Sequence, residues 1–343
     1  MPRYFIIADG EIEEKISVAL YRELKQKSPR SPVFFLSLLR PGNFRKRGLK
    51  ETRWRGSRHG MLFWYSFCKT FWRRRGWKED LVLVGGRTFP LLLIFLLTGK
   101  KAFFIGVSKT WEESFRFFQL FFVRYFAKTV FLNDQDRVKE LRQRNIPAYF
   151  SGNLLADFLS PGDFSFPAGE KTVFSLFPRA SHVEHDLSFL QETVDMIASR
   201  TPAYFLLVIP KGTKVHEIRK YAEGTGWHWR RSLEGEVMEG YLCKDKIYIN
   251  VTTFYQEALN QSDFVISFDP VRTIQAVGLG KKIVPVSMLT PKEVLALLAN
   301  PTYLFEHNLL LSRRFGEKGG IGSVACFLLF GVVEDRRFVA KGA

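Results

Sequence analysis

The sequence is poor in the residues that build metal centres and disulfide frameworks. It holds three cysteines and six histidines in 343 residues. Cys68, Cys243 and Cys326 lie far apart and form no CxxC or zinc-type spacing. His182 and His185 are three positions apart, but no further ligand pattern surrounds them. We therefore expect no metal or other cofactor, and we expect free thiols in a reducing compartment.

Long apolar runs and a secretory leader are also lacking. The longest uncharged apolar run, TFPLLLIFLLTG from Thr88, is about a dozen residues long, whereas a membrane span needs about 20. The first residues enter a strand-like run, RYFII, without the basic-then-apolar layout of a signal peptide. These features predict a cytoplasmic protein that is either soluble or bound to a membrane surface.

Acidic residues are scarce in one segment. The chain has 51 Lys and Arg against 34 Asp and Glu, a formal net charge of +17. Residues 40–78 alone contain 13 Lys and Arg, with Glu51 as the one acid. Such a local excess favours a polyanionic partner, which is nucleic acid, an anionic membrane surface or a phosphorylated substrate.

The same basic segment is rich in aromatic residues. Arginines next to tryptophans suit the headgroup boundary of an anionic membrane, where charge meets lipid phosphate and rings lie at the interface. Two alternatives are single-stranded nucleic acid, with bases stacked on the rings, and a solvated loop with inward aromatics. We favour the membrane over nucleic acid, and residues 112–128 extend this surface or form a buried helix. The predicted membrane residues are Trp54, Trp64, Trp72, Arg73, Arg74, Arg75 and Trp77.

Strand-like and helix-like segments alternate along the chain, which predicts an α/β fold. Apolar runs such as VFFLSLL, LVLVGG and AFFIGV read as strands buried on both faces of a parallel sheet. The Pro- and Gly-rich segment 161–169 predicts a linker between a domain at 1–160 and a domain at 170–343. We expect two doubly wound, Rossmann-like domains facing across a cleft, with the last helix packing back on the first domain.

Residues 262–286, SDFVISFDPVRTIQAVGLGKKIVPV, outline a strand–helix–strand unit. The loop after the first strand lies where parallel sheets hold ligands, and it offers Thr273, Gln275 and the amides that begin the helix. A helix N-terminus favours a diphosphate because its free N–H groups and its dipole face the anion. The alternative is an ordinary unit in which Gly278 and Gly280 only end the helix.

Four segments, in order along nearly the whole chain, resemble motifs of the lipid-A-disaccharide synthase-related proteins. PAYFSGNLLADFL resembles "GNP-hydrophobic-x-D", and LVLVGGRTFPLLLIFLLTGKKAFFIGVSK resembles "VGDxxPLxxAxxxGxPxxFVGTAK". FYQEALNQSDFVISFDPVRTIQAVGLGKKIVPV resembles "ALxxADLVIGxAGTATEQAVGLGKPVV", and RRFGEKGGIGSV resembles "RMGxxGASRRIA". The resemblance implies a GT-B fold and the transfer of a sugar from a nucleotide sugar, UDP-linked, to a lipid or polyprenyl-linked acceptor. It also implies a peripheral place on the inner face of the cytoplasmic membrane.

The resemblance further implies which residues hold the donor. Lys109 in GVSK and Asn153 in SGN match motif positions, and so do Arg314 and Gly319 in RRFGEKGG. A surface lysine and a simple turn asparagine are the alternatives for the first two.

Other motif positions depart from the family. Ile274 stands where a glutamate is expected to hold the ribose, Gly86 stands for an aspartate, and Arg179 stands for a phosphate-approaching glycine. An arginine could supply phosphate charge directly. These departures leave open a catalytically degenerate membrane scaffold with the same fold.

Transfer to a hydroxyl group needs a base near the acceptor oxygen. Asp9, Glu13 and Glu14 follow the first predicted strand, at the carboxyl edge where open α/β sheets place their sites. We predict Glu13 or Glu14 as the base, with Asp9 nearby. The alternative is that these acids only complement the dipole of a helix first turn.

Overall fold

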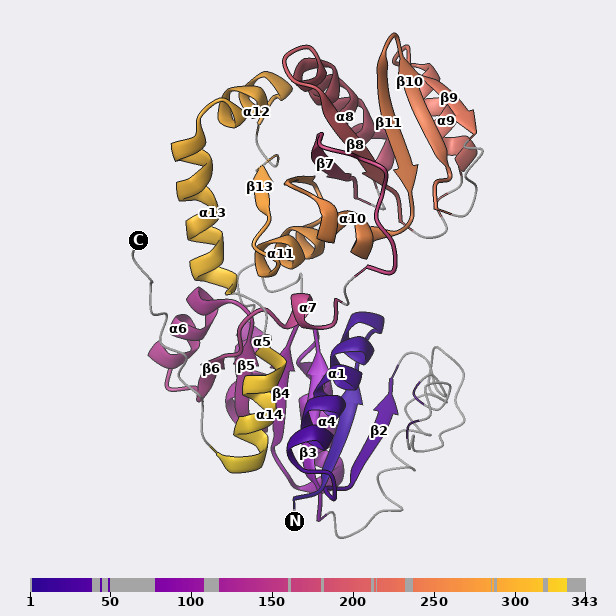
Figure 1. Ribbon diagram of the computed structural model, residues 1–343. Helices are drawn as coiled ribbons and strands as arrows, with labels where there is room; N and C mark the ends of the chain where they lie inside the picture. Colours follow the sequence, from indigo (N-terminus) through magenta and orange to yellow (C-terminus); the bar gives the residue numbers. More distant parts are fainter. Residues whose placement is uncertain are drawn as a thin grey trace. The chain divides into compact units, whose positions relative to one another are not determined.

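The computed structural model describes residues 2–38, 44, 49, 78–107, 117–159, 162–179, 182–210, 213, 215–231, 237–284, 286, 289–316 and 320–331. Contacts divide the chain into two compact units (Figure 1). Unit 1 comprises Met1–Phe158 with Lys318–Ala343, and unit 2 comprises Leu159–Glu317. The chain thus leaves unit 1, builds unit 2 and returns.

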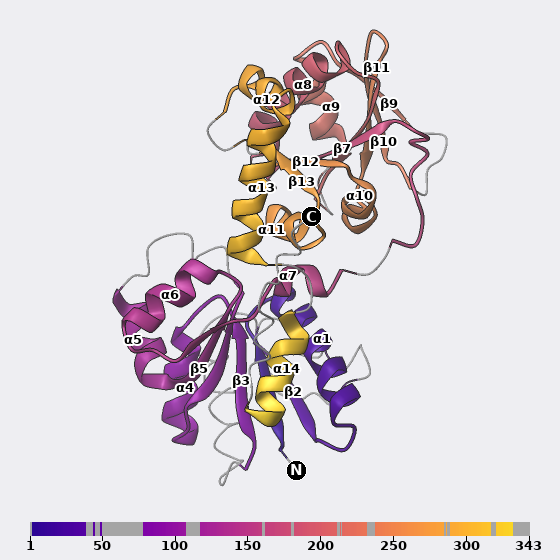
Figure 2. The same ribbon diagram turned by 60° about the vertical axis from the view of Figure 1, so that its left-hand side comes forward.

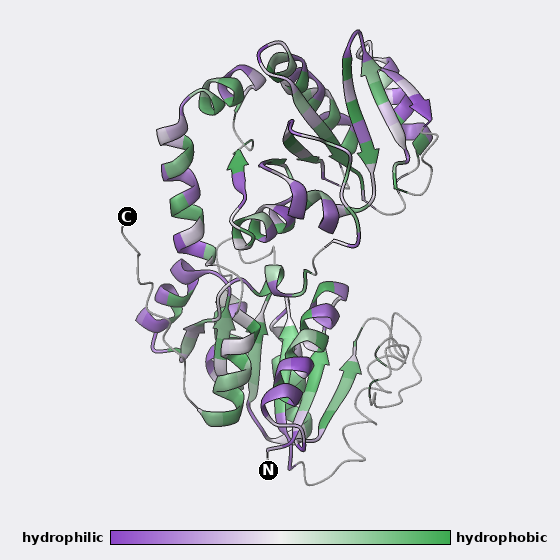
Figure 3. Cartoon of the chain, viewed as in Figure 1, coloured by the Kyte–Doolittle hydropathy of each residue, from purple (hydrophilic) through white to green (hydrophobic). Residues whose placement is uncertain are grey.

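Unit 1 is built on a six-stranded sheet in the order β2-β1-β3-β4-β5-β6, and every neighbouring pair is parallel. The strands are apolar and buried, as the sequence predicted, and Figure 3 shows them in green. The elements are β1 (Tyr4–Ala8), α1 (Glu11–Lys27), β2 (Val33–Ser37), β3 (Asp80–Gly85), α4 (Phe89–Thr98), β4 (Ala102–Gly106), α5 (Phe117–Phe126), β5 (Ala127–Leu132), α6 (Gln135–Gln143), β6 (Ala148–Phe150), α7 (Leu154–Asp157) and α14 (Gly320–Phe330).

Helices cover both faces of this sheet because alternate strand residues point to opposite sides. Phe5 and Ile7 of β1 pack in one core with Leu91 and Ile94 of α4, and this core continues to α5 and α6. The opposite face carries α1 and α14, which contact each other (Figure 2). Unit 1 is therefore doubly wound, with three layers.

The last described helix, α14, belongs to the packing of unit 1. The Tyr4 hydroxyl donates a hydrogen bond to the carbonyl oxygen of Leu328 at 2.6 Å, across 324 positions of sequence. At the start of α14, a Cβ atom on Gly320 would overlap the carbonyl oxygen of Ser151. At Gly322, two residues on, the nearest atom to such a Cβ is a carboxylate oxygen of Glu23 at 3.6 Å. Close approach of α14 therefore depends on the first of these glycines.

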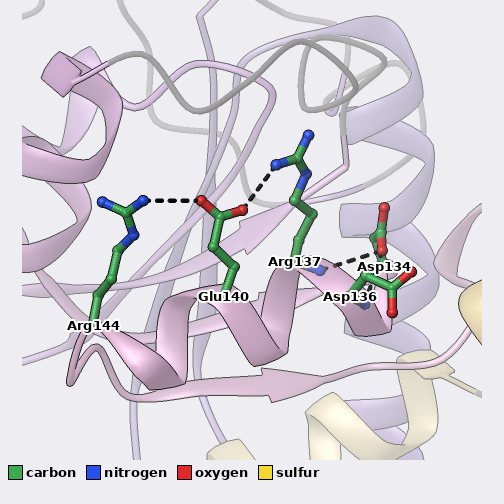
Figure 4. A network of polar contacts seen from close by, with 5 residues as sticks. All are labelled: Asp134, Asp136, Arg137, Glu140 and Arg144. Carbon is green, nitrogen blue, oxygen red and sulfur yellow. Dashed lines mark hydrogen bonds and ion pairs between the residues drawn. The ribbon is translucent and has the colours of Figure 1, made fainter.

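Helix α6 carries a local network of polar contacts. Asp134 caps it by accepting hydrogen bonds from the amides of Asp136 and Arg137. Glu140 lies between two arginines, 2.8 Å from Arg137 and 3.4 Å from Arg144 (Figure 4). Such surface pairs are worth at most about 1 kcal/mol each, so this network orders side chains more than it stabilises the fold.

Unit 2 contains a seven-stranded sheet in the order β13-β12-β7-β8-β11-β10-β9. The strands from β13 to β11 pair in parallel, whereas β10 pairs antiparallel with β11 and β9. The elements are β7 (Thr172–Phe177), α8 (Val183–Ala198), β8 (Ala203–Val208), α9 (Val215–Glu223), β9 (His228–Arg231), β10 (Gly240–Lys244), β11 (Ile247–Thr252), α10 (Tyr255–Gln261), β12 (Phe264–Ser267), α11 (Pro270–Gly278), β13 (Lys282–Val284), α12 (Pro291–Leu298) and α13 (Pro301–Phe315).

Three features of unit 2 differ from the sequence-based description. The antiparallel strands β9 and β10 and the helix α13 were not predicted. The segment predicted as a linker packs on unit 2, where the Gln261 side chain bonds both the amide and the carbonyl of Phe166, at 2.6 and 2.7 Å. Unit 2 accordingly begins at Leu159 and ends at Glu317 rather than running from 170 to 343.

Candidate functional site

The strand order of unit 1 reverses direction at the carboxyl ends of β1 and β3. From β1 the chain crosses to β2 on one side, and from β3 it crosses to β4 on the other side. The loops after these two neighbouring strands therefore diverge, which is the topological switch point where open α/β sheets bind ligands. The loop after β1 carries Asp9, and the loop after β3 carries Gly86, Arg87 and Thr88.

Asp9 is held close to the end of β3. Its amide donates to the carbonyl oxygen of Val84 at 3.0 Å. A Cβ atom on Gly85 would lie 3.3 Å from the Cβ of Asp9, so the missing side chain at that position leaves room for the carboxylate. Two adjoining strands thus fix the acid at the switch point.

The environment of Asp9 raises its pKa to about 6, because burial penalises the charged form. The guanidinium of Arg87 and a backbone hydrogen bond at Arg87 act in the opposite direction and limit the rise. A carboxylate with a pKa near neutrality is suited to accept and return a proton. Arg87 is a site residue that sequence reasoning missed, although it follows the VGG turn directly.

Glu13 shares this environment. Its carboxylate occupies the space above Gly10, where a Cβ atom would overlap Oε2. Burial raises the pKa of Glu13, its own backbone amide lowers it, and the charges of Asp9 and Glu14 raise it further. Asp9 and Glu13 therefore form a coupled pair of acids at the switch point.

Glu14 has a different role. Its side chain is 1% exposed. It accepts a hydrogen bond of 2.5 Å from the hydroxyl of Ser37, the last residue of β2. This contact ties α1 to β2, so Glu14 is held by a structural partner, whereas Asp9 and Glu13 are the acids at the switch point.

Unit 2 has an equivalent switch point at the carboxyl ends of β7 and β12. These strands are neighbours, and their connections run to β8 and β13 on opposite sides. Phe268 after β12 donates its amide to the carbonyl of Phe177 at the end of β7, at 2.9 Å. The residues after both strands, Arg179 and Asp269, therefore reach the same edge of the sheet.

Arg179 is fixed at this edge by a buried acid. Its backbone amide and Nε donate to Asp186 Oδ2 at 2.8 and 3.0 Å, and NH2 donates to Oδ1 at 2.5 Å. Asp186 has no exposed surface, while the Arg179 side chain is 40% exposed. Burial alone would raise the pKa of Asp186, but the bonds from Arg179 hold it below its usual value. The guanidinium also lies 5.3 Å from the ring centre of Phe268, and its exposed part remains able to meet an anion.

The N-terminus of α11 is less open than the sequence suggested. Pro270 has no amide hydrogen, and the amide of Val271 is bonded to the side chain of Asp269 at 2.9 Å. Thr273 donates its hydroxyl to the carbonyl oxygen of Asp269 at 3.1 Å. The first two residues of α11 therefore offer no free amide hydrogen to a diphosphate, because one is a proline and the amide of the other is bonded to the capping carboxylate.

Gln275 does not reach the surface at this edge of the sheet. It is fully buried, and its Oε1 accepts a 2.7 Å bond from Arg272. The Arg272 guanidinium in turn lies 3.6 Å from the ring centre of Tyr255. We therefore assign Gln275 to positioning Arg272, a second cation on the first turn of α11 that sequence reasoning did not single out.

The remaining predicted residues are spread over both units. Asn153 is fully buried and caps α7, accepting a bond from the amide of Ala156 at 3.1 Å, which is the simple turn role left open above. Arg314 lies at the end of α13, a helix that packs against α11. Lys109, Gly319 and the predicted membrane residues of segment 54–77 lie outside the described residues. Within the described part of the chain, no group of His, Cys, Asp and Glu has the arrangement of a metal site.

Comparison with solved structures finds this fold in enzymes. A Listeria monocytogenes protein assigned as a UDP-N-acetylglucosamine 2-epimerase is 14% identical, with a TM-score of 0.64 over 96% of this chain and 95% of that chain. UDP-GlcNAc 2-epimerase from Neisseria meningitidis, bound to UDP-GlcNAc, is 12% identical, with a TM-score of 0.62 over 97% and 100%. Anabaena Alr3699/HepE, in complex with UDP-glucose, is 13% identical, with a TM-score of 0.56 over 97% and 100%.

No protein-family model and no curated protein matches the sequence. The structural likenesses confirm the predicted fold, which consists of two Rossmann-like α/β units of the GT-B type. They do not single out lipid-A-disaccharide synthase among the proteins that share it.

Proposed function

We propose that the protein is a UDP-sugar-dependent glycosyltransferase that delivers its sugar to a lipid-linked acceptor. The observation that carries this proposal is the placement of Asp9, which the ends of β1 and β3 hold at the switch point of unit 1 and whose pKa burial raises to about 6. At neutral pH it is mostly ionised and able to take the proton of an acceptor hydroxyl, and Arg87 lies beside it. Glu13 is the second candidate for this role.

The donor would bind to unit 2. Arg179 follows β7 and Arg272 follows β12, at the same carboxyl edge of the sheet, where they would supply the positive charge that a diphosphate needs. This arrangement compensates for the amides lost at Pro270 and Val271. That UDP and UDP-sugars are bound by solved proteins of this fold supports the assignment.

A UDP-sugar epimerase is the second candidate. The observation in its favour is the higher TM-score of the epimerases, 0.61 to 0.64, against 0.54 to 0.56 for the transferase and HepE structures. An epimerase needs no acceptor, so UDP-GlcNAc incubated alone with the protein would yield its C2 epimer, which NMR detects. The transferase predicts UDP release that depends on added lipid-linked acceptor.

The first test is thermal stability with UDP, UDP-GlcNAc, UDP-glucose, GDP and ADP. A ligand at 100 times its dissociation constant adds about 2.7 kcal/mol, which raises the melting temperature by several degrees. We expect a shift with the uridine compounds and none with ADP. Arg272→Ala is expected to abolish this shift, whereas Arg219→Ala, which removes an exposed arginine of α9, keeps it. No shift with any nucleotide would favour the degenerate scaffold.

A further inference from the structure

The outer face of α4 and α5 is apolar although it faces solvent. Helix α4 reads FPLLLIFLLT, and of its ten residues only Pro90, Leu91 and Ile94 are buried. Helix α5 reads FFQLFFVRYF, with Gln119 and Arg124 as its polar residues. A helix that is apolar all round is normally buried in a core or in a membrane. Here one side of each helix packs on the sheet of unit 1, and the other side is exposed.

The exposed side chains form one connected surface, which we call the α4–α5 face. It consists of Phe89, Leu96, Phe118, Phe121 and Tyr125, with exposed fractions from 41% to 69%. Helices α4 and α5 pack against each other. Ring contacts join them. The ring centres of Phe122 and Phe89 are 5.9 Å apart, and those of Phe126 and Phe95 are 5.1 Å apart. Contiguous exposed patches of this kind mark interaction surfaces.

The charges on the described residues of this face have one sign. Residues 81–107 and 117–133 contain no aspartate or glutamate. Arg124 is exposed on α5 next to Phe121 and Tyr125, and Lys100 and Lys101 are exposed where α4 meets β4. The partner should therefore be apolar and anionic.

We propose that the α4–α5 face docks on the surface of an anionic lipid bilayer. Aromatic side chains with a basic border match the headgroup boundary, where rings bury and cations meet lipid phosphates. A second copy of the chain fits poorly, because a two-fold interface would set these bases against themselves, and neither α4 nor α5 carries an acid to pair with them. Ten-residue helices are about 15 Å long, half the hydrocarbon thickness, so they lie in the interface. Accordingly, no described helix is long and apolar enough to cross a membrane.

The position of this face also indicates how a lipid-linked acceptor would reach Asp9, and this part of the inference rests on the proposed function. Helix α4 begins two residues after Arg87, and α5 also starts at the carboxyl edge of the sheet because it leads into β5. Phe89, Phe118 and Phe121 therefore lie towards the edge that carries Asp9. An acceptor with a lipid tail, held in the bilayer, would present its hydroxyl near this base.

The test is partition of the full chain onto vesicles without nucleotide, so that it is independent of the UDP measurement. Vesicles of phosphatidylcholine and phosphatidylglycerol in equal parts are compared with phosphatidylcholine alone. In the variant, Leu96, Phe118 and Phe121 become serine. In the matched control, Tyr303, Phe305 and Leu310, which are equally exposed on α13 of unit 2, become serine. Circular dichroism verifies that both variants fold.

We expect the α4–α5 variant to lose at least about tenfold in partition onto the mixed vesicles, and the α13 control to stay within about twofold of wild type. The wild-type chain should prefer the mixed vesicles by about tenfold, and Arg124→Glu should reduce this preference. Equal partition of wild type and the α4–α5 variant would overturn the proposal, whatever the basic segment 40–78 contributes. A wild-type dimer in lipid-free ultracentrifugation that the same variant converts to monomer would also overturn it, in favour of an interface between copies.

Discussion

Replacing Asp9 by asparagine tests the site in unit 1 through stability as well as activity. The pKa of about 6 lies about 2.2 above the ordinary value of 3.8. One pKa unit is worth about 1.36 kcal/mol, so ionising Asp9 in the folded protein costs about 3 kcal/mol. Because the folded state holds the proton more tightly than the unfolded state, the protonated acid stabilises unit 1 at low pH. This stabilisation is lost as the pH rises from about 4 through 6.

The asparagine introduced in this variant cannot ionise, so the variant lacks this pH dependence. Near pH 7.5 we expect Asp9→Asn to be more stable than wild type by up to about 3 kcal/mol, on the order of 6 °C in melting temperature for a unit of this size. At pH 5 the advantage should shrink to about half. Turnover at neutral pH should fall by about 100-fold or more, because an amide cannot accept the proton.

The assay is thermal unfolding of wild type and variant in parallel from pH 5 to 8, with activity measured at each pH. Only the difference between the two proteins is used, so that titrating groups outside the Asp9–Glu13 pair cancel. Asp136→Asn, at an exposed position of α6, is the control and should follow wild type at every pH. A stability difference that stays constant from pH 5 to 8 would refute the reasoning about the burial of Asp9.

Four further substitutions test two other contacts. Arg179→Ala leaves Asp186 buried without its guanidinium partner, so we expect a loss of about 2 kcal/mol in urea unfolding together with weaker UDP binding. Arg179→Lys should recover part of the stability, but a lysine cannot reproduce the paired hydrogen bonds of a guanidinium. If this lysine variant binds UDP as tightly as wild type, Arg179 does not contact the phosphate. Gly320→Ala should destabilise unit 1 by about 2 kcal/mol through overlap with the neighbouring backbone. Gly322→Ala should be neutral or stabilise by up to about 1 kcal/mol, and similar losses in both variants would contradict the close packing assigned to the first glycine.

Much of the fold follows from sequence pattern. Uninterrupted apolar runs such as those of β3 and β4 are typical of strands buried on both faces, and they alternate with helices, so two doubly wound sheets could be predicted. Helix α13 was missed because its residues were interpreted only as a match to a loop motif around Arg314. The strands β9 and β10 were missed because HWRR and GYLCK are short and polar on one face.

The site could be predicted only in part. The edge after β1 pointed to Asp9 and Glu13 because parallel strands end at one edge of the sheet. No sequence pattern indicated that Glu14 turns to Ser37 or that Arg179 turns to Asp186. These are contacts between side chains on different elements, and only the packed structure defines them. The hydrogen bond from the Val271 amide to Asp269 at the start of α11 could have been predicted, since aspartate before proline is a common helix start.

The return of α14 to unit 1 has a consequence for synthesis on the ribosome. Phe327 lies 5.1 Å from the rings of both Phe131 and Tyr149, so one face of the first sheet is finished only by the last helix. From β6, ending at Phe150, to the end of α14 at Phe330 the ribosome adds 180 residues. At about 5–20 residues per second this takes roughly 10 to 35 s. During that interval unit 2 can fold as a continuous segment, while the nascent first sheet keeps an aromatic surface open to chaperones.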